Sequence, residues 1–117
     1  MLSLAAMLVG VAALAQVTTS SLNGFVAEES GEPLPGAVVL AVHVPTGSQY
    51  HAIANNQGLY AIKGMRAGGP YEVTFTFFGL QTLVVKDVTL QLGESYKLDA
   101  KLKEATQTLH EVTVVAS

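Results

Sequence analysis

The sequence predicts an all-β fold, a small antiparallel β-sandwich, and two features indicate it. Apolar and polar residues alternate with a period of two in the segments 71–77 and 96–102, which is typical of strands buried on one face only. Turn signals that contain glycine recur about every ten residues, as they do between the short strands of sandwiches and barrels. Helical periodicity with caps is missing, apart from a weak pattern over 101–109. The length of 117 residues allows one such domain.

The chain begins with an apolar stretch, and none of its first 27 residues carries a charged side chain. A transmembrane helix needs about 20 apolar residues, whereas the apolar segment 1–15 stops at Gln16. An apolar run that ends in a small-x-small motif, here supplied by Ala13 and Ala15, is typical of a signal peptide. No Lys or Arg precedes the run, and a buried apolar helix is the alternative. We expect an exported protein, cleaved before Gln16, with a short linker over 16–20.

The predicted strands follow one another along the rest of the chain. The segment 36–44 is apolar on both faces, which predicts a central strand, and Pro33 and Pro35 fix an extended segment before it. The polar stretch 103–108 predicts a linker. In order, the expected strands are 21–27, 36–44, 49–54, 60–63, 71–77, 82–90, 96–102 and 110–115.

The composition excludes several classes of protein. Half of the residues are hydrophobic, at 50%, so the chain is too apolar to be disordered. It contains no Cys, which excludes a disulfide scaffold and Cys-ligated zinc. A net charge of −3 argues against nucleic-acid binding, which calls for a basic surface.

The sequence predicts no catalytic residues, no cofactor and no metal site. It has no nucleophile elbow, no phosphate loop and no His-Glu-x-x-His motif. Its only imidazoles are those of His43, His51 and His110. His43 and His51 flank a predicted turn and would face each other across a hairpin, but zinc requires at least three protein ligands and no third is apparent. We expect surface or cross-strand histidines, with a metal site as the alternative.

Aromatic residues are the candidates for a binding platform. A sandwich needs large side chains in its core, which is the expected role of most of them, but exposed coplanar rings would stack on sugars or bases. Tyr50 and Tyr60 are the best candidates for such a platform. The full set is Tyr50, Tyr60, Tyr71, Tyr96, Phe75, Phe77 and Phe78.

The C-terminal segment 109–117 is extended in character, because it is apolar and rich in β-branched residues. One interpretation is an edge strand of the sandwich. The other is a strand offered to a partner's sheet, where main-chain hydrogen bonds supply affinity and alternate side chains supply register. The sequence favours neither interpretation.

Three motifs together resemble carboxypeptidase regulatory-like domains. They are Asn23-Gly24-Phe25-Val26, the hinge Gly31-Glu32-Pro33-Leu34-Pro35-Gly36-Ala37-Val38-Val39, and the turn Asn55-Asn56-Gln57-Gly58-Leu59-Tyr60. The resemblance implies a seven-stranded Greek-key sandwich, transthyretin-like or immunoglobulin-like, over residues 21–103. It implies no peptidase activity, since in that family the zinc site belongs to a separate domain.

The order of parts narrows the expected function. A signal peptide, this domain and a C-terminal part over 104–117, made of a linker and a Leu-x-Glu-Val-x-Val-like segment at 109–116, resemble the N-terminus of TonB-dependent outer-membrane receptors of the Oar-like and SusC-like kind. The resemblance implies a non-enzymatic domain in the periplasm or at the outer membrane. Its partner would be a TonB-like energising protein or the receptor's own plug and barrel. An exported carbohydrate-binding module, with a glycan as partner, is the alternative, because the fold resembles starch-binding domains.

The same resemblance identifies the residues of a TonB-box-like strand as Leu109, Glu111, Val112, Thr113 and Val114. Pairing through Val112 and Val114, with Glu111 providing charge complementarity, is the expected mechanism. The ending Val114-Val115-Ala116-Ser117 departs from the Val-Thr-Ala or Val-Thr-Gly that is commoner in such boxes.

Overall fold

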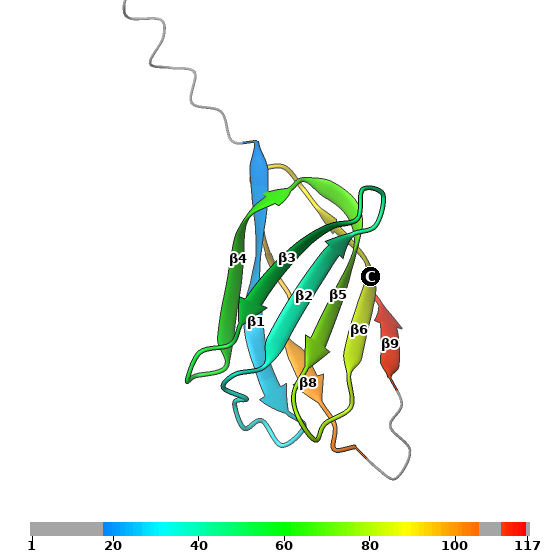
Figure 1. Ribbon diagram of the computed structural model, residues 1–117. Coiled ribbons are helices and arrows are strands. Elements are labelled where there is room, and N and C mark those ends of the chain that lie inside the picture. Colours follow the sequence, from blue (N-terminus) through cyan, green and yellow to red (C-terminus); the bar gives the residue numbers. More distant parts are fainter. Residues whose placement is uncertain (1–17, 106–110, 117) are drawn as a thin grey trace, which may run out of the picture.

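The computed structural model describes residues 18–105 and 111–116, in which all regular secondary structure is β (Figure 1). The predicted signal peptide, with Ala13, Ala15 and Gln16, lies outside the described residues, as do Leu109 and His110. Within that described part no helix has the length and hydropathy of a membrane span. The strands are β1 (Thr19–Glu28), β2 (Val38–His43), β3 (Ser48–Ile53), β4 (Leu59–Arg66), β5 (Gly68–Thr76), β6 (Leu83–Leu90), β7 (Ser95–Lys97), β8 (Ala100–Leu102) and β9 (Val112–Val115).

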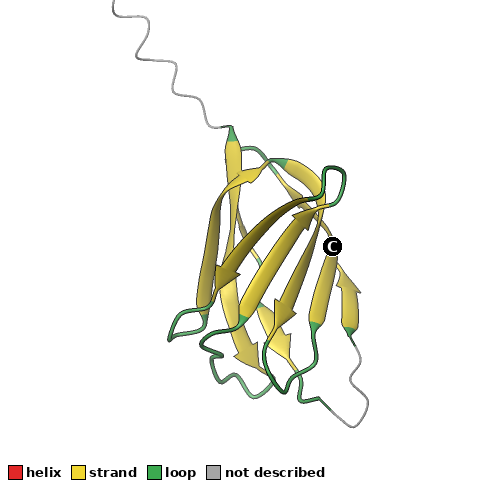
Figure 2. Cartoon of the chain, in the orientation of Figure 1, coloured by secondary structure: helices red, strands yellow, loops and turns green. Residues whose placement is uncertain are grey.

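The strands form two sheets that face each other, as Figure 2 shows. One sheet has the order β4-β1-β7, with β8 also paired to β1, and the other has the order β3-β2-β5-β6-β9. The predicted all-β sandwich is confirmed. The seven strands of the expected sandwich correspond to β1 through β6 and the β7–β8 segment, and the expected strand 110–115 corresponds to β9. β2 lies between β3 and β5, as its apolar faces predict.

The pairing of the late strands differs from a purely antiparallel arrangement. β7 and β8 run parallel to β1, and β9 runs parallel to β6. Alternation of polar and apolar residues fixes which face of a strand is buried but carries no information on strand direction. The mixed character of both sheets therefore could not be read from the pattern.

The predicted strand 96–102 is divided between β7 and β8 at Leu98 and Asp99. The carbonyl oxygen of Leu98 accepts a hydrogen bond of 2.6 Å from the Tyr60 hydroxyl. The carboxylate of Asp99 accepts one of 2.9 Å from the backbone N–H of Phe25, in place of a strand carbonyl. Gly24 lies under this crossing, where a Cβ would overlap the Leu98 carbonyl oxygen. The glycine therefore allows β1 to pass close to the break.

The core lies between the two sheets and is built from both. The large side chains that are fully buried include Leu22 from β1, Met65 from β4, and Tyr71 and Phe75 from β5. The ring of Tyr60 meets that of Phe75 edge to face, with 5.8 Å between centroids. Burial of these apolar side chains is the main source of stability, because the chain has no disulfide.

The proline hinge closes one end of the core. Pro33 and Pro35 are exposed, whereas Leu34 between them is buried in the core cluster. The Leu34 N–H donates to the Val26 carbonyl at 3.0 Å, which ties the hinge to β1. The hinge thus has a structural role, as the extended Pro-Leu-Pro segment predicts.

Candidate functional site at the β9 edge

β9 is attached to one edge of the five-stranded sheet and lies beside β6 (red in Figure 1). It pairs in parallel register, with Leu83 opposite Val112 and Val85 opposite Val114. The N–H of Val112 donates to the Thr82 carbonyl at 2.8 Å, and the N–H of Ala116 donates to the Lys86 carbonyl at 2.7 Å. Residues Val112–Val115 therefore form a strand of this sheet.

The backbone of β9 has one occupied edge and one free edge. In a parallel ladder alternate residues direct both their N–H and their C=O to the same neighbour. Val112 and Ala116 face β6, so Val114 between them does too. Thr113 and Val115 face away, and no strand of the described part pairs with that side. Within the described part, the residues of β9 with free backbone groups are therefore Thr113 and Val115.

The side chains of β9 are exposed on both faces of the sheet. Val112 and Val114 point to the same side as Leu83 and Val85, which pack on the core, yet they remain 37% and 43% exposed. Val115 on the other side is 63% exposed. β9 therefore extends beyond the part of the sheet that the opposite sheet covers.

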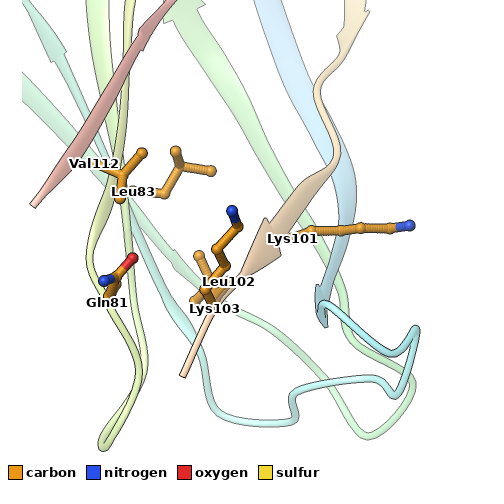
Figure 3. A pocket seen from close by; sticks show the side chains of 6 residues that line it. All are labelled: Gln81, Leu83, Lys101, Leu102, Lys103 and Val112. Carbon is orange, nitrogen blue, oxygen red and sulfur yellow. The ribbon is translucent and has the colours of Figure 1, made fainter. Parts of the chain in front are cut away.

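A small pocket of about 50 Å³ lies where the opposite sheet stops covering the five-stranded sheet (Figure 3). Leu83 and Val112 lie next to each other on one side of it, and Leu102 from β8 lies on the other. The side chain of Lys101 extends away from the pocket. The remaining lining residues are Gln81 and Lys103. The pocket is thus an apolar gap between β6 and β8 with lysines at its border.

The irregular conformation of β6 after Lys86 limits how many residues of β9 pair with it. β6 is regular from Leu83 to Lys86, but Asp87 has a φ of 61°, a left-handed conformation that interrupts an extended strand. β9 pairs with the regular part only. Glu111 before β9 is exposed, and Lys86 lies opposite Val115, so the uncharged strand is flanked by one charge of each sign.

The two histidines of the predicted hairpin do not face each other. Ser48 lies opposite His43, and His51 lies opposite Leu40. His43 is buried, its Nδ1 is 2.7 Å from the Thr46 hydroxyl, and its ring packs edge to face on Tyr71. Among residues 18–105 and 111–116, no three His, Cys, Asp or Glu side chains are grouped so that they could hold a metal ion.

Tyr50 and Tyr60 do not form an exposed stacking platform. Tyr60 is 4% exposed, and burial, reinforced by the charge of Asp99, raises the pKa of its hydroxyl far above the ordinary value. Tyr50 is half-buried, and its hydroxyl oxygen accepts a hydrogen bond of 3.2 Å from the backbone N–H of Arg66. Burial, with the neighbouring Tyr50, likewise raises the pKa of Tyr71 to about 12. These tyrosines belong to the core and its margin.

A hollow that the sequence did not indicate lies on the other sheet. It has a volume of about 390 Å³, and its apolar part consists of Phe25 and Leu59, which are opposite each other on β1 and β4. Both residues occupy outward positions of their strands, next to the inward-facing Val26 and Tyr60. Because these neighbours are apolar too, the sequence pattern carries no signal that would have revealed the outward pair. The remaining lining residues are Asn23, Gly24, Tyr60, Lys97 and Asp99.

The fold and the site define a small β-sandwich module that carries a docked edge strand. The family model for the carboxypeptidase regulatory-like domain matches residues 21–103, more than half of the chain. The protein therefore belongs to the carboxypeptidase regulatory-like domain family, as its motifs predict. No curated protein matches the sequence.

Solved structures with similar folds include proteins of different kinds. The Bacillus anthracis TIE protein has a TM-score of 0.62 and 21% identity, over 75% of this chain and 17% of that one. Hydroxyquinol 1,2-dioxygenase from Pseudomonas putida has a TM-score of 0.59 and 11% identity, over 78% and 58%. A candidate carbohydrate-binding protein from Bacteroides uniformis has a TM-score of 0.54 and 21% identity, over 71% and 40%. The chain thus spans less than two thirds of each of these structures, and the likeness concerns the fold alone.

Proposed function

We propose that this protein is the periplasmic N-terminal extension of a TonB-dependent outer-membrane receptor and that it acts by contact with another protein, without catalysis. The observation that carries the proposal is the strand β9, which is uncharged and, among the residues that the structure describes, hydrogen-bonded along one edge only. A strand of this kind is a ready template for pairing with another chain. Its partner is a TonB-like energising protein.

The arrangement of the two parts supports the proposal. The family match ends at residue 103, and β9 begins at Val112, so the strand lies outside the matched sandwich unit and is added to its sheet. A segment that is appended to a stable domain can be recognised without disturbing the core. This agrees with the resemblance of Glu111, Val112, Thr113 and Val114 to a TonB box.

A carbohydrate-binding function has weaker support. The tyrosines that would have formed a stacking platform are buried or half-buried. The likeness to the Bacteroides uniformis protein is at 21% identity and concerns the fold. We therefore retain protein–protein contact as the proposed function.

The proposal is tested by titrating the ¹⁵N-labelled chain with the C-terminal domain of TonB and following backbone amide shifts. We expect the largest shifts at residues 111–116 and small ones in the rest of the sandwich. Shifts confined to other surfaces, or no shifts at all, would refute the assignment of β9 as the contact strand.

A matched pair of variants sharpens the test. Val115→Asp places a charge on β9 at a position that is 63% exposed, and Ile53→Asp places one on β3, the opposite edge of the same sheet, at a position that is 69% exposed. We expect Val115→Asp to weaken binding about tenfold or more, which corresponds to about 1.4 kcal/mol. Ile53→Asp should bind like the unmodified chain. Equal weakening by both variants would contradict a contact through β9.

A further inference from the structure

We infer that the partner's strand adds to the free edge of β9 while β9 remains on β6, so that β9 becomes an internal strand of a sheet shared by two proteins. This inference rests on the proposed function and specifies its geometry. The alternative is that β9 leaves β6 and is transferred to the partner. The two arrangements use different backbone groups of the same four residues, so hydrogen exchange of single amides can distinguish them.

The groups that β9 offers are fixed by its present pairing. Val112 and Val114 direct their N–H and C=O groups to β6 and have none available for a second strand. Thr113 and Val115 direct theirs to the open side. A partner that adds to this side therefore hydrogen-bonds to Thr113 and Val115 without breaking any existing bond.

Release of β9 would uncover residues that are now buried. Val84 on β6 is buried, with Thr74 on β5 and Thr113 on β9 as its neighbours in register, and Val85 is part of the core cluster. Ala116, just after β9, packs against the same cluster. Removal of the strand would expose this apolar surface and leave the β6 ladder unpaired, which opposes transfer. A docked strand is also already ordered, which lowers the entropic cost of binding.

The free edge of β9 lacks the features by which natural sheets prevent edge pairing. Such edges usually carry charged residues, prolines or bulges. Val112–Val115 contains none of these, whereas the edge strand β4 of the other sheet carries Lys63 and Arg66 and has a glycine with positive φ at Gly64. The edge of β9 is therefore more open to pairing than the edge of β4.

The chemistry of the edge defines the partner segment. It is a short, extended polypeptide without charged residues in the paired stretch, because charges there would lie against the Val112 and Val114 side chains, which extend beyond the opposite sheet. The charges that flank β9 are of opposite sign, with Glu111 before the strand and Lys86 opposite its end. We expect the partner segment to carry the complementary charges at its two ends.

Hydrogen exchange of single amides in the full chain tests the inference, with the TonB C-terminal domain as the probe. The amides of Val84 and Lys86 face β9, and those of Thr113 and Val115 face the open side. On binding we expect Thr113 and Val115 to gain protection while Val84 and Lys86 keep theirs. Binding that removes protection from Val84 and Lys86 would show that β9 is released. This result would overturn the inference but not the proposed function.

Two neighbouring proline variants provide a matched comparison. Thr113→Pro removes an N–H on the open side and leaves the β6 ladder intact, and Val114→Pro removes one that is directed to β6. We expect Thr113→Pro to weaken probe binding about tenfold or more with Val84 and Lys86 still protected. Val114→Pro should remove the hydrogen-exchange protection of the Val84 and Lys86 amides. It therefore provides the reference for a chain in which β9 has left β6. Unchanged binding by Thr113→Pro would overturn the inference.

The same experiment separates the remaining outcomes. If the unmodified chain shows no binding to the probe, the proposed function fails and the inference fails with it. If Thr113 and Val115 are protected without the probe, and increasingly so at higher protein concentration, the edge belongs to a second copy of this chain, and the inference is overturned. Protection of the amide of Phe75 in the core verifies that each variant is folded.

Discussion

β8 and β9 are alike in length and pairing but differ in how well they are covered. Each is a strand of three or four residues that runs parallel to a longer neighbour at the margin of its sheet. In β8, Ala100 and Leu102 are 4% and 1% exposed. The corresponding inward residues of β9, Val112 and Val114, are more than a third exposed. Parallel pairing at an edge is therefore compatible with opposite degrees of burial.

The difference arises from what lies opposite each strand. The side chains of Leu102 and Leu83 approach each other from the two sheets, whereas beyond the pocket that they line no described strand faces β9. Burial contributes most of the stability of such a strand, and its ladder bonds contribute less. We conclude that β8 belongs to the stable sandwich, while β9 is an exposed strand at the edge of its sheet.

The largest effect on the free energy of unfolding is expected when a buried side chain of β8 is truncated. Leu102→Ala deletes a fully buried side chain from the core cluster, and such deletions lower the free energy of unfolding by about 2–5 kcal/mol. Urea denaturation followed by circular dichroism measures this. A loss below about 1 kcal/mol would mean that β8 is no better anchored than β9 and would remove the distinction between them.

The sequence predicts the covered region better than the exposed one. Strict alternation in 71–77 and apolar character on both faces of 36–44 correctly indicate β5 and the central strand β2. Each of these signals is local, because it depends only on the period of the strand itself. Burial of Tyr60 could not be predicted in the same way. Its neighbour Leu59 is also apolar, so the pattern does not show which of the two points inward.

The exposure of β9 depends on features far away in the sequence. Whether Val112 and Val114 are covered is determined by the width of the opposite sheet, which ends at β8, and no local pattern encodes that width. Parallel docking on β6 is likewise a long-range feature. The sequence left two interpretations of this segment, an edge strand and a partner strand. The structure shows residues 112–115 as an edge strand on β6, and pairing with a partner is what we propose.

A second prediction concerns the crossing of β1 under the break between β7 and β8. A side chain at Gly24 would overlap the Leu98 carbonyl oxygen, so Gly24→Ala forces the strands apart. We expect a loss of about 1–3 kcal/mol in the free energy of unfolding, as for other substitutions that overfill a packed site. Asn23→Ala, whose side chain only bonds to the Ser95 hydroxyl, is the control and should cost less than about 1 kcal/mol. Equal losses of unfolding free energy in the two variants would show that β1 is loosely packed against the break and that β8 is as weakly held as an edge strand.

Alkaline pH should lower the free energy of unfolding of the sandwich. Burial raises the pKa of Tyr71 to about 12, while in the unfolded chain tyrosine ionises near its ordinary value of about 10. Between these values the unfolded state releases a proton that the folded state retains, so the free energy of unfolding falls as pH rises. Urea denaturation between about pH 8 and 11 should show this fall, and Tyr71→Phe should make it shallower. An unchanged slope in the variant would indicate that Tyr71 ionises freely in the fold.

The smallest effect is expected in β9 itself. Val114→Ala removes methyl groups that are already 43% exposed, so the free energy of unfolding should fall by less than about 1 kcal/mol. The β-branched side chain also favours the extended backbone, so the variant should open more often from β6. We therefore expect faster hydrogen exchange at Val84 and Lys86, with no change at Phe75. If exchange accelerates equally at Phe75, opening of β9 is coupled to global unfolding, and β9 is part of the stable sandwich after all.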